Sequence, residues 1–414
     1  PDFWTYTEVV SWAGKTLRIE ADKMPVDSTA LAALKLADGR PDPEGMYREA
    51  LRPQFHFSPA RGWTNDPNGL LYYDGEYHLF FQHNPFGVAW GNMTWGHAVS
   101  TDLFHWKQLP DAIHQDALGT IFSGCGVVDR DNTAGWQTGD EKVLVAIYTS
   151  AGGTNAESQG EPFTQSVAYS NDRGRTWTKF DGNPVLGHIV GGNRDPKVIY
   201  HEPTKRWVMA LFLDGTDFAL FTSPDLKRWK RTCDVPMPDT RECPDFFPLA
   251  VDGDPGNVKW VFWGANGNYR LGGFDGEVFT PETDVLKSRW GQQWYAAQTY
   301  SDIPESDGRR IIIAWMSGGQ YPGMPFNQQM STPCVLTLRT TDEGIRLYRR
   351  PVRELAGLHE DHFSIEDKEL VPDDNPLSYL SGELFDIHAE IAPADAAEVG
   401  FSIRGNPITY NVEK

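Results

Sequence analysis

The segment Ser170-Asn171-Asp172-Arg173-Gly174-Arg175-Thr176-Trp177 bears most directly on the fold of this chain. Its Ser-x-Asp opening is typical of a tight turn, because the Asp side chain accepts hydrogen bonds from the backbone amides that follow it. The tryptophan would then pack on the next strand. Two shorter versions occur, in which Ser100-Thr101-Asp102 leads to Trp106 and Ser223-Pro224-Asp225 leads to Trp229.

The spacing of these turns suggests a repeat architecture. The three tryptophans are 71 and 52 residues apart, and periods of this size indicate the four-stranded blades of a β-propeller. Residues 53–345 contain the repeats and would hold five blades of roughly 58 residues each. A β-sandwich remains an alternative, although it would not need the repeat. The predicted strands include the short apolar runs Leu79–Phe81, Val143–Tyr148, Val167–Tyr169, Trp207–Leu213, Trp260–Trp263 and Ile311–Met316.

Composition narrows the class of protein. A chain of 414 residues predicts two or three domains, and its 40 glycines and 29 prolines fit many short strands. The net charge of −20 argues against nucleic acid as a partner. The longest apolar run has seven residues, whereas a membrane-spanning helix needs about 18 or more. A neutral ligand such as a carbohydrate fits both the charge and the many aromatic side chains.

Two regions flank the predicted propeller. Within residues 1–52 we expect two strands, at Phe3–Val10 and Thr16–Ala21. A short helix at Ala30–Ala37 and a linker at Gly39–Gly45 would follow them. Residues 346–414 contain alternating stretches at Glu383–Ile391 and Val399–Ile403 that predict the start of a C-terminal β-sandwich, truncated at Lys414. Because the chain opens on Pro1 without a methionine or signal peptide, we expect a mature or trimmed fragment.

Four cysteines are spread along the chain. None lies in a Cys-x-x-Cys or Cys/His arrangement, so the sequence predicts no structural metal. A disulfide between Cys233 and Cys243 is possible, but nothing in the sequence requires it, and the redox compartment stays open.

Three carboxylate residues lie in distinctive surroundings. Asp66 is part of Trp63-Thr64-Asn65-Asp66-Pro67-Asn68-Gly69, Asp195 of Asn193-Arg194-Asp195-Pro196, and Glu242 of Arg241-Glu242-Cys243-Pro244-Asp245. Each has an ordinary explanation as a turn, a surface ion pair or a solvated side chain. On different blades of a propeller, however, all three would converge at the central axis.

Such a convergence suits glycoside hydrolysis. The reaction uses one carboxyl group to protonate the leaving oxygen and another to meet the developing cation, at about 5–5.5 Å in retaining enzymes. Glu242 precedes Cys243, Pro244, Phe246 and Phe247, and apolar surroundings would raise the pKa of a general acid. Arg194 is a candidate to help keep Asp66 ionised.

With these motifs the chain resembles glycoside hydrolase family 32, which includes invertases, inulinases, levanases and fructan β-fructosidases. The resemblance runs from about Arg52 to about Arg350. It implies a retaining β-fructofuranosidase that acts on sucrose, inulin or levan without a cofactor or a metal. It also implies that Asp66 is the nucleophile, Asp195 the transition-state stabiliser and Glu242 the acid/base.

The same resemblance implies a fructose pocket. Its predicted residues are Asn65, Gln82, Trp90, Phe122, Ser123, Arg194 and Trp315, of which the polar ones can hydrogen-bond hydroxyl groups and the aromatic ones can exclude water. For each aromatic the alternative is a place in the propeller core, and this alternative is weaker for Trp90, which stands near Gly91 and Asn92. The family usually has Met or Leu where Thr64 stands and Ser where Cys125 stands, and these departures concern specificity. We expect this chain to be secreted or periplasmic.

Three rival functions share some of these features. A fructosyltransferase would use the same carboxylates with a sugar acceptor in place of water. A sialidase shares the Ser-x-Asp turns, but it needs an arginine cluster and a tyrosine nucleophile, which are not evident. A non-catalytic fructan-binding protein would not need all three carboxylates. The motifs leave open the preferred linkage, exo or endo attack and the oligomeric state.

Overall fold

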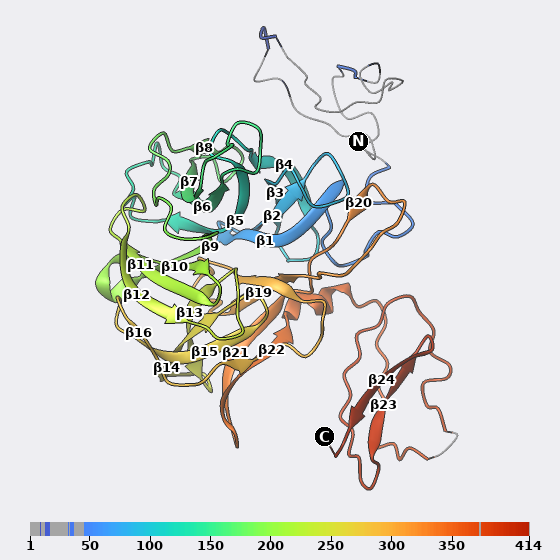
Figure 1. The fold of residues 1–414 in the computed structure, drawn as a ribbon. Coiled ribbons are helices and arrows are strands. Elements are labelled where there is room, and N and C mark those ends of the chain that lie inside the picture. Colours follow the sequence, from blue (N-terminus) through green and yellow to red (C-terminus); the bar gives the residue numbers. More distant parts are fainter. Residues whose placement is uncertain are drawn as a thin grey trace. The chain divides into compact units, whose positions relative to one another are not determined.

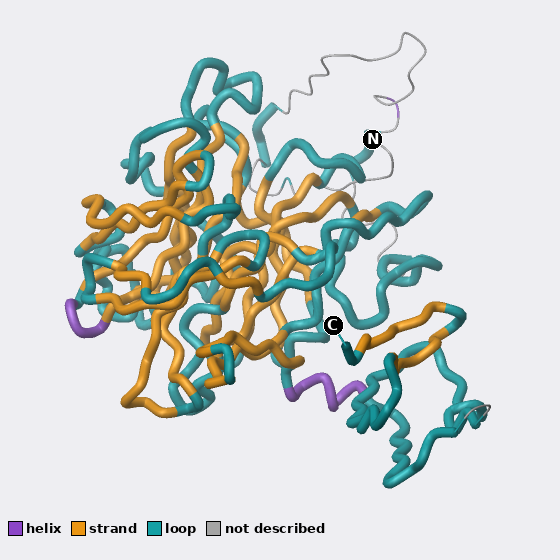
Figure 2. Tube along the Cα trace, turned by 60° about the horizontal axis from the view of Figure 1, so that its bottom comes forward, coloured by secondary structure: helices purple, strands orange, loops and turns teal. Residues whose placement is uncertain are grey.

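The computed structural model describes residues 45–371 and 374–413, together with residues 9, 13–16, 32 and 34–36. The strands and helix predicted between Phe3 and Ala37 lie almost wholly outside the described residues. Elsewhere the chain consists of strands and loops with short 3-10 helices, such as η3 (Glu202–Thr204) and η4 (Arg353–Leu358) (Figure 2). The contacts divide the chain into two units, Pro1–His359 and Glu360–Lys414.

The first unit is a five-bladed β-propeller, and its blades follow one another along the chain (Figure 1). Blade I contains β1 (Gly62–Tyr73), β2 (Glu76–Asn84), β3 (Thr94–Ser100) and β4 (Lys107–Ile113). Blade II contains β5 (Thr120–Asp129), β6 (Val143–Ala151), β7 (Phe163–Ser170) and β8 (Thr178–Lys179). Blade III contains β9 (Arg194–His201), β10 (Arg206–Asp214), β11 (Asp217–Ser223) and β12 (Lys230–Pro236).

The last two blades are built in the same way. Blade IV contains β13 (Asp245–Val251), β14 (Asp254–Trp263), β15 (Asn268–Phe274) and β16 (Phe279–Pro281), and β17 (Leu286–Lys287) pairs with β15. Blade V contains β18 (Tyr295–Thr299), β19 (Arg310–Trp315), β21 (Cys334–Thr341) and β22 (Gly344–Pro351). The short strand β20 (Phe326–Asn327) runs parallel to β1, which links the last part of the propeller to its first blade.

The repeated Ser-x-Asp segments form turns, as the sequence predicted, and they join the third strand to the fourth in blades I, II and III. Asp102 accepts hydrogen bonds from the amides of Phe104 and His105, and Asp172 and Asp225 form the equivalent bonds. The indole of each following tryptophan donates to a backbone carbonyl of the turn, over 2.9, 3.0 and 3.2 Å. The repeat is therefore structural.

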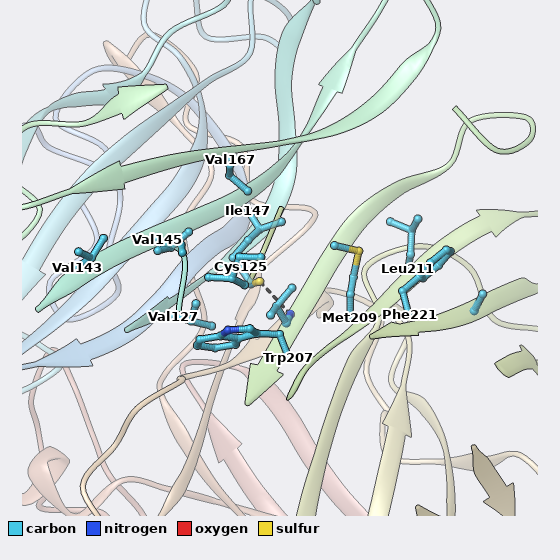
Figure 3. Close-up of a cluster of buried hydrophobic side chains, with 14 of the residues drawn as sticks. Cys125, Val127, Val143, Val145, Ile147, Val167, Trp207, Met209, Leu211 and Phe221 are labelled. Carbon is cyan, nitrogen blue, oxygen red and sulfur yellow. Dashed lines mark hydrogen bonds between the residues drawn. The ribbon is translucent and has the colours of Figure 1, made fainter. Parts of the chain in front are cut away.

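The core lies mainly in clusters between neighbouring blades. One of them packs Val127 and Ile147 of blade II against Trp207 and Met209 of blade III (Figure 3). Cys125, in the same cluster, accepts a hydrogen bond from the Val198 amide over 3.0 Å. All the apolar runs predicted as strands fall largely or wholly within strands of the propeller. The sequence thus predicted the catalytic-domain fold class correctly.

The second unit contains one hairpin among its described residues, formed by β23 (Glu398–Ile403) and β24 (Asn406–Asn411). The stretch Val399–Ile403 is a strand as predicted. The predicted strand Glu383–Ile391 is not formed, because alternation of side chains gives a strand only when a neighbour takes up its backbone hydrogen bonds. The predicted domain boundary at residue 345 falls within β22.

Candidate active site

Asp66 lies on β1, at a β-bulge between Thr64 and Pro67. Bulges of this kind turn a side chain away from the regular strand direction and are frequent beside active sites. Position 69 requires a glycine for two reasons. Its backbone has φ = 56°, and a Cβ atom there would lie 2.4 Å from the Phe80 ring. The local sequence therefore combines a bulge with a close approach to β2.

The Asp66 carboxylate is held by three donors. Asn65 donates to Oδ1 over 3.1 Å, Ser123 to Oδ2 over 2.6 Å, and the Cys243 thiol contacts Oδ2 at 3.5 Å. Asn65 is in turn fixed by the Trp63 indole over 2.9 Å. Burial raises the pKa of Asp66, while the hydrogen bonds from Ser123 and Asn65 oppose that rise.

Asp195 is the second residue of β9 and is only 3% exposed. Its backbone has φ = 63°, a conformation that non-glycine residues rarely adopt. Its amide donates to Thr149 Oγ1 over 2.9 Å, and its Oδ2 accepts the Cys243 amide over 3.1 Å. Burial raises the pKa of Asp195 to about 7, although the nearby Arg194 guanidinium acts in the opposite direction.

Glu242 precedes β13 in a segment of unusual backbone. Glu242 and Cys243 have φ values of 53° and 39°, and strain of this kind concentrates at functional sites. The Glu242 carboxylate forms an ion pair with Arg194 and accepts the Tyr295 hydroxyl over 2.8 Å. The strained turn therefore presents the carboxylate to two polar partners.

Two expectations about this region were wrong. The apolar neighbours Phe246 and Phe247 do not surround the Glu242 carboxylate, because both rings are buried in core clusters of the propeller. Arg194, which was expected to keep Asp66 ionised, forms its ion pairs with Glu242 and Asp195. The alternation of β13 explains the first error, since Glu242 lies on the turn before that strand begins.

The three carboxylates come from segments of blades I, III and IV and meet around one residue. The Cys243 thiol lies 3.5 Å from Asp66 Oδ2 and 3.4 Å from Asp195 Oδ2, and Glu242 is its neighbour in the chain. Burial, reinforced by the two aspartates, keeps the pKa of this thiol well above its usual value. The thiol is therefore protonated, and it can donate to either carboxylate.

The other predicted pocket residues differ in their surroundings. Gln82 is 2% exposed, and its Nε2 has no hydrogen-bond partner among the described residues, so it has a donor to offer. Trp315 packs edge-on against Trp63 and Tyr295 near the carboxylates, at 6.3 and 6.4 Å between ring centroids.

Trp90 and Phe122 form an aromatic pair with centroids 5.9 Å apart. Trp90 is 57% exposed, which excludes a place in the propeller core. Phe122 is half-buried and also contacts the Phe163 ring. Both rings therefore lie where a ligand could cover them.

Sequence reasoning missed three residues. Tyr295 contacts Glu242 from blade V, the Cys243 thiol contacts two carboxylates, and Trp63 orients Asn65. Cys243 and Trp63 stand inside the quoted motifs and could have been found there. Tyr295 is one of 15 tyrosines, and nothing in its local sequence distinguishes it.

A buried ion pair lies close to the site along the same strands. Lys197 Nζ is 3.4 Å from Asp245 Oδ2, and the two side chains are 1% and 0% exposed. Lys197 also donates to the Thr299 carbonyl, and the Thr299 amide donates to Asp245 over 2.6 Å. These bonds tie the inner strands of blades III, IV and V together beside Asp195 and Glu242.

No group of three or more potential metal ligands is found in the described part of the chain. All four cysteines are free, including Cys233 and Cys243. No helix among the described residues combines the length and apolar character that a membrane crossing requires.

A propeller with carboxylates at one end of its inner strands defines a class of glycoside hydrolase. Residues 56–351 match the model of the glycosyl hydrolases family 32 N-terminal domain, and the chain belongs to this family. It is 44% identical over 384 residues to a levanase from Bacillus subtilis (strain 168), covering 86% of this chain and 56% of the levanase. Against the levanase of Bacillus sp. (strain L7) the identity is 38%, over 86% of this chain and 41% of that protein. The chain thus spans about half the length of these relatives.

Solved structures show the same fold. The exo-inulinase from Aspergillus awamori is 35% identical with a TM-score of 0.65, covering 74% of this chain and 68% of that one. The fructofuranosidase from Schwanniomyces occidentalis complexed with fructose is 33% identical with a TM-score of 0.66, covering 74% and 64%.

Proposed function

We propose that this chain is the catalytic part of a retaining β-fructofuranosidase, which hydrolyses terminal β-D-fructofuranosyl linkages in sucrose and fructans. The observation that carries the proposal is the meeting of Asp66, Asp195 and Glu242 around Cys243. Retaining glycoside hydrolysis requires carboxyl groups that converge in this way. The substrate class is inferred from relatives that are named levanase, exo-inulinase and fructofuranosidase.

In the first step Asp66 attacks the anomeric carbon of the fructosyl unit while Glu242 protonates the departing oxygen. Water, deprotonated by Glu242, then releases the sugar, so that two inversions restore the configuration. Asp195 stabilises the oxocarbenium-like state through the fructosyl hydroxyl groups. Asn65 and Ser123 hold the Asp66 carboxylate in one orientation, which lowers the cost of reaching the transition state.

The substrate is a neutral carbohydrate. Gln82 and Arg194 offer hydrogen-bond donors to its hydroxyl groups, and Trp90, Phe122 and Trp315 offer apolar surface to its ring. No cofactor enters this scheme, because carboxyl groups carry all the proton and charge transfer. Secretion is inferred from Aspergillus relatives that are named extracellular exo-inulinases.

The proposal is tested by the products that the protein forms from sucrose, inulin and levan. We expect free fructose from at least one of them, and a loss of at least about four orders of magnitude, or ~5 kcal/mol in barrier, in Asp66→Asn. Asp74→Asn, at an exposed carboxylate paired with Arg173, is the control and should be fully active. Activity of Asp66→Asn within tenfold of the wild type would remove the assignment. Fructosyl transfer in place of hydrolysis at high sucrose would favour a fructosyltransferase.

A further inference from the structure

A cavity of about 290 Å³ lies at the ends of the inner strands β5 and β9, away from the catalytic carboxylates. Asp195 is at the start of β9, whereas Ile199 and Tyr200 near its end line the cavity together with the end of β5 and with Ser301 and Asp302. At about 3.3 Å per residue, Tyr200 lies roughly 17 Å along β9 from Asp195. The cavity is therefore separate from the catalytic carboxylates.

The lining of this cavity has unused hydrogen-bonding capacity. Ser301 is 7% exposed, yet its hydroxyl has no partner among the described residues, whereas buried polar groups are normally paired. The Arg310 guanidinium lies over the Phe247 ring and donates to the Tyr300 carbonyl over 3.2 Å. It has no carboxylate within ion-pair distance in the described chain, so most of its five N–H donors remain available.

The charges of the lining disfavour an anionic ligand. Asp129, Asp131, Glu202 and Asp302 outnumber the two arginines, Arg130 and Arg310. The cavity offers no set of three metal ligands within the described residues either. The lining offers both hydrogen-bond donors and acceptors beside the Tyr200 ring. This ring packs on Trp207 with the two centroids 4.9 Å apart. This combination suits a neutral polyhydroxyl compound.

We infer that this cavity is a second carbohydrate-binding site that takes one hexose unit of a fructan chain. Its volume is close to the lower end of the range of about 300–1,000 Å³ for small-molecule sites, which fits a single sugar ring. The inference rests on the proposed function for the identity of the sugar. A disaccharide cannot reach from this cavity to Asp66, so the site acts only on polymers, by raising their effective concentration at the enzyme.

Kinetics on short and long substrates test this inference. The double variant Tyr200→Phe/Ser301→Ala removes two hydroxyl groups and leaves the packing of both side chains. We expect its KM for levan or inulin to rise about tenfold, the loss of two hydrogen bonds, while kcat and KM for sucrose stay unchanged. Tyr169→Phe is the matched control, because the Tyr169 ring stacks on Trp136 in blade II. This variant should change the kinetic constants for neither fructan nor sucrose.

Direct binding gives a second readout that does not depend on the cavity variant. Calorimetric titration of Asp66→Asn with an inulin-type oligosaccharide should give two sites per chain, and one site when Tyr200→Phe/Ser301→Ala is added. A single site in both proteins, or equal KM values for fructan in wild type and double variant, would overturn the inference. If the wild type instead cleaves neither sucrose nor fructan, the proposed function fails, which is a different outcome.

Discussion

Cys243 donates its backbone N–H to the Asp195 carboxylate over 3.1 Å. This bond connects the segment that carries Glu242 to the inner strand of the preceding blade. The thiol of the same residue contacts both Asp66 and Asp195, so one side chain bridges the two aspartates. The two left-handed residues of the turn each cost of order 1–3 kcal/mol, and these bonds are what hold them in place.

Asp195 should make stability depend on pH. Its folded pKa of about 7 is above the unfolded value of about 3.9. The proton on Asp195 therefore contributes its full amount to the free energy of unfolding below about pH 4. This contribution is lost as the pH rises through 7. Asp195→Asn should be more stable than the wild type at pH 8, by about 2–4 kcal/mol, and nearly equal to it at pH 4. Urea unfolding at both pH values measures this.

Asp102 provides a control of opposite sign. Burial works against its ionisation, but hydrogen bonds from His105 and Phe104 lower the pKa of Asp102 to about 2. Its contribution is present above about pH 4 and is lost as the pH falls toward 2. Asp102→Asn should therefore be less stable than the wild type at pH 8. If Asp195→Asn is also destabilised at pH 8, the raised pKa of Asp195 is wrong.

Tyr295 should matter for catalysis through Glu242. Burial, together with the charge of Glu242, raises the pKa of Tyr295, so the phenol remains a donor at any working pH. Tyr295→Phe removes the hydroxyl that donates to Glu242, and kcat/KM for sucrose should fall about tenfold to a hundredfold. Tyr73→Phe loses a similar 2.8 Å bond, to Glu141, and should keep its activity. Equal activities of the two variants would show that Tyr295 has no role in the site.

The buried pair Lys197–Asp245 should carry a large share of the stability. Lys197→Met leaves the buried Asp245 carboxyl without its partner, which costs about 3–5 kcal/mol. Adding Asp245→Asn removes that carboxyl group and should recover part of the loss. Lys205→Met breaks an exposed pair with Glu202 and should leave the stability almost unchanged. Thermal unfolding of the wild type, the two single variants and the double variant measures these differences. A loss of stability in Lys197→Met as small as that in Lys205→Met would contradict the account.

The sequence predicted those features that depend on local pattern. The turn before Trp177 and the apolar runs such as Trp207–Leu213 specify strands and blades because their chemistry is local. The motifs around Asp66 and Asp195 also pointed to one end of the inner strands. Contacts across blades left no such signal, since the Tyr295–Glu242 bond joins residues 53 positions apart. Arg194 was assigned the wrong partner for the same reason.

The central claim is that Asp66 is the nucleophile and Glu242 the acid/base, and one reaction tests it directly. Glu242→Ala should cleave sucrose more slowly than the wild type by about a hundredfold to ten-thousandfold, because glucose needs a proton to leave. A fructosyl donor with a stable anionic leaving group should form the Asp66-bound intermediate far more readily. Azide should then accelerate turnover and yield β-fructosyl azide, identified by NMR, whereas Asp66→Ala should give none. Equal loss with good and poor leaving groups, and no effect of azide on Glu242→Ala, would contradict the account.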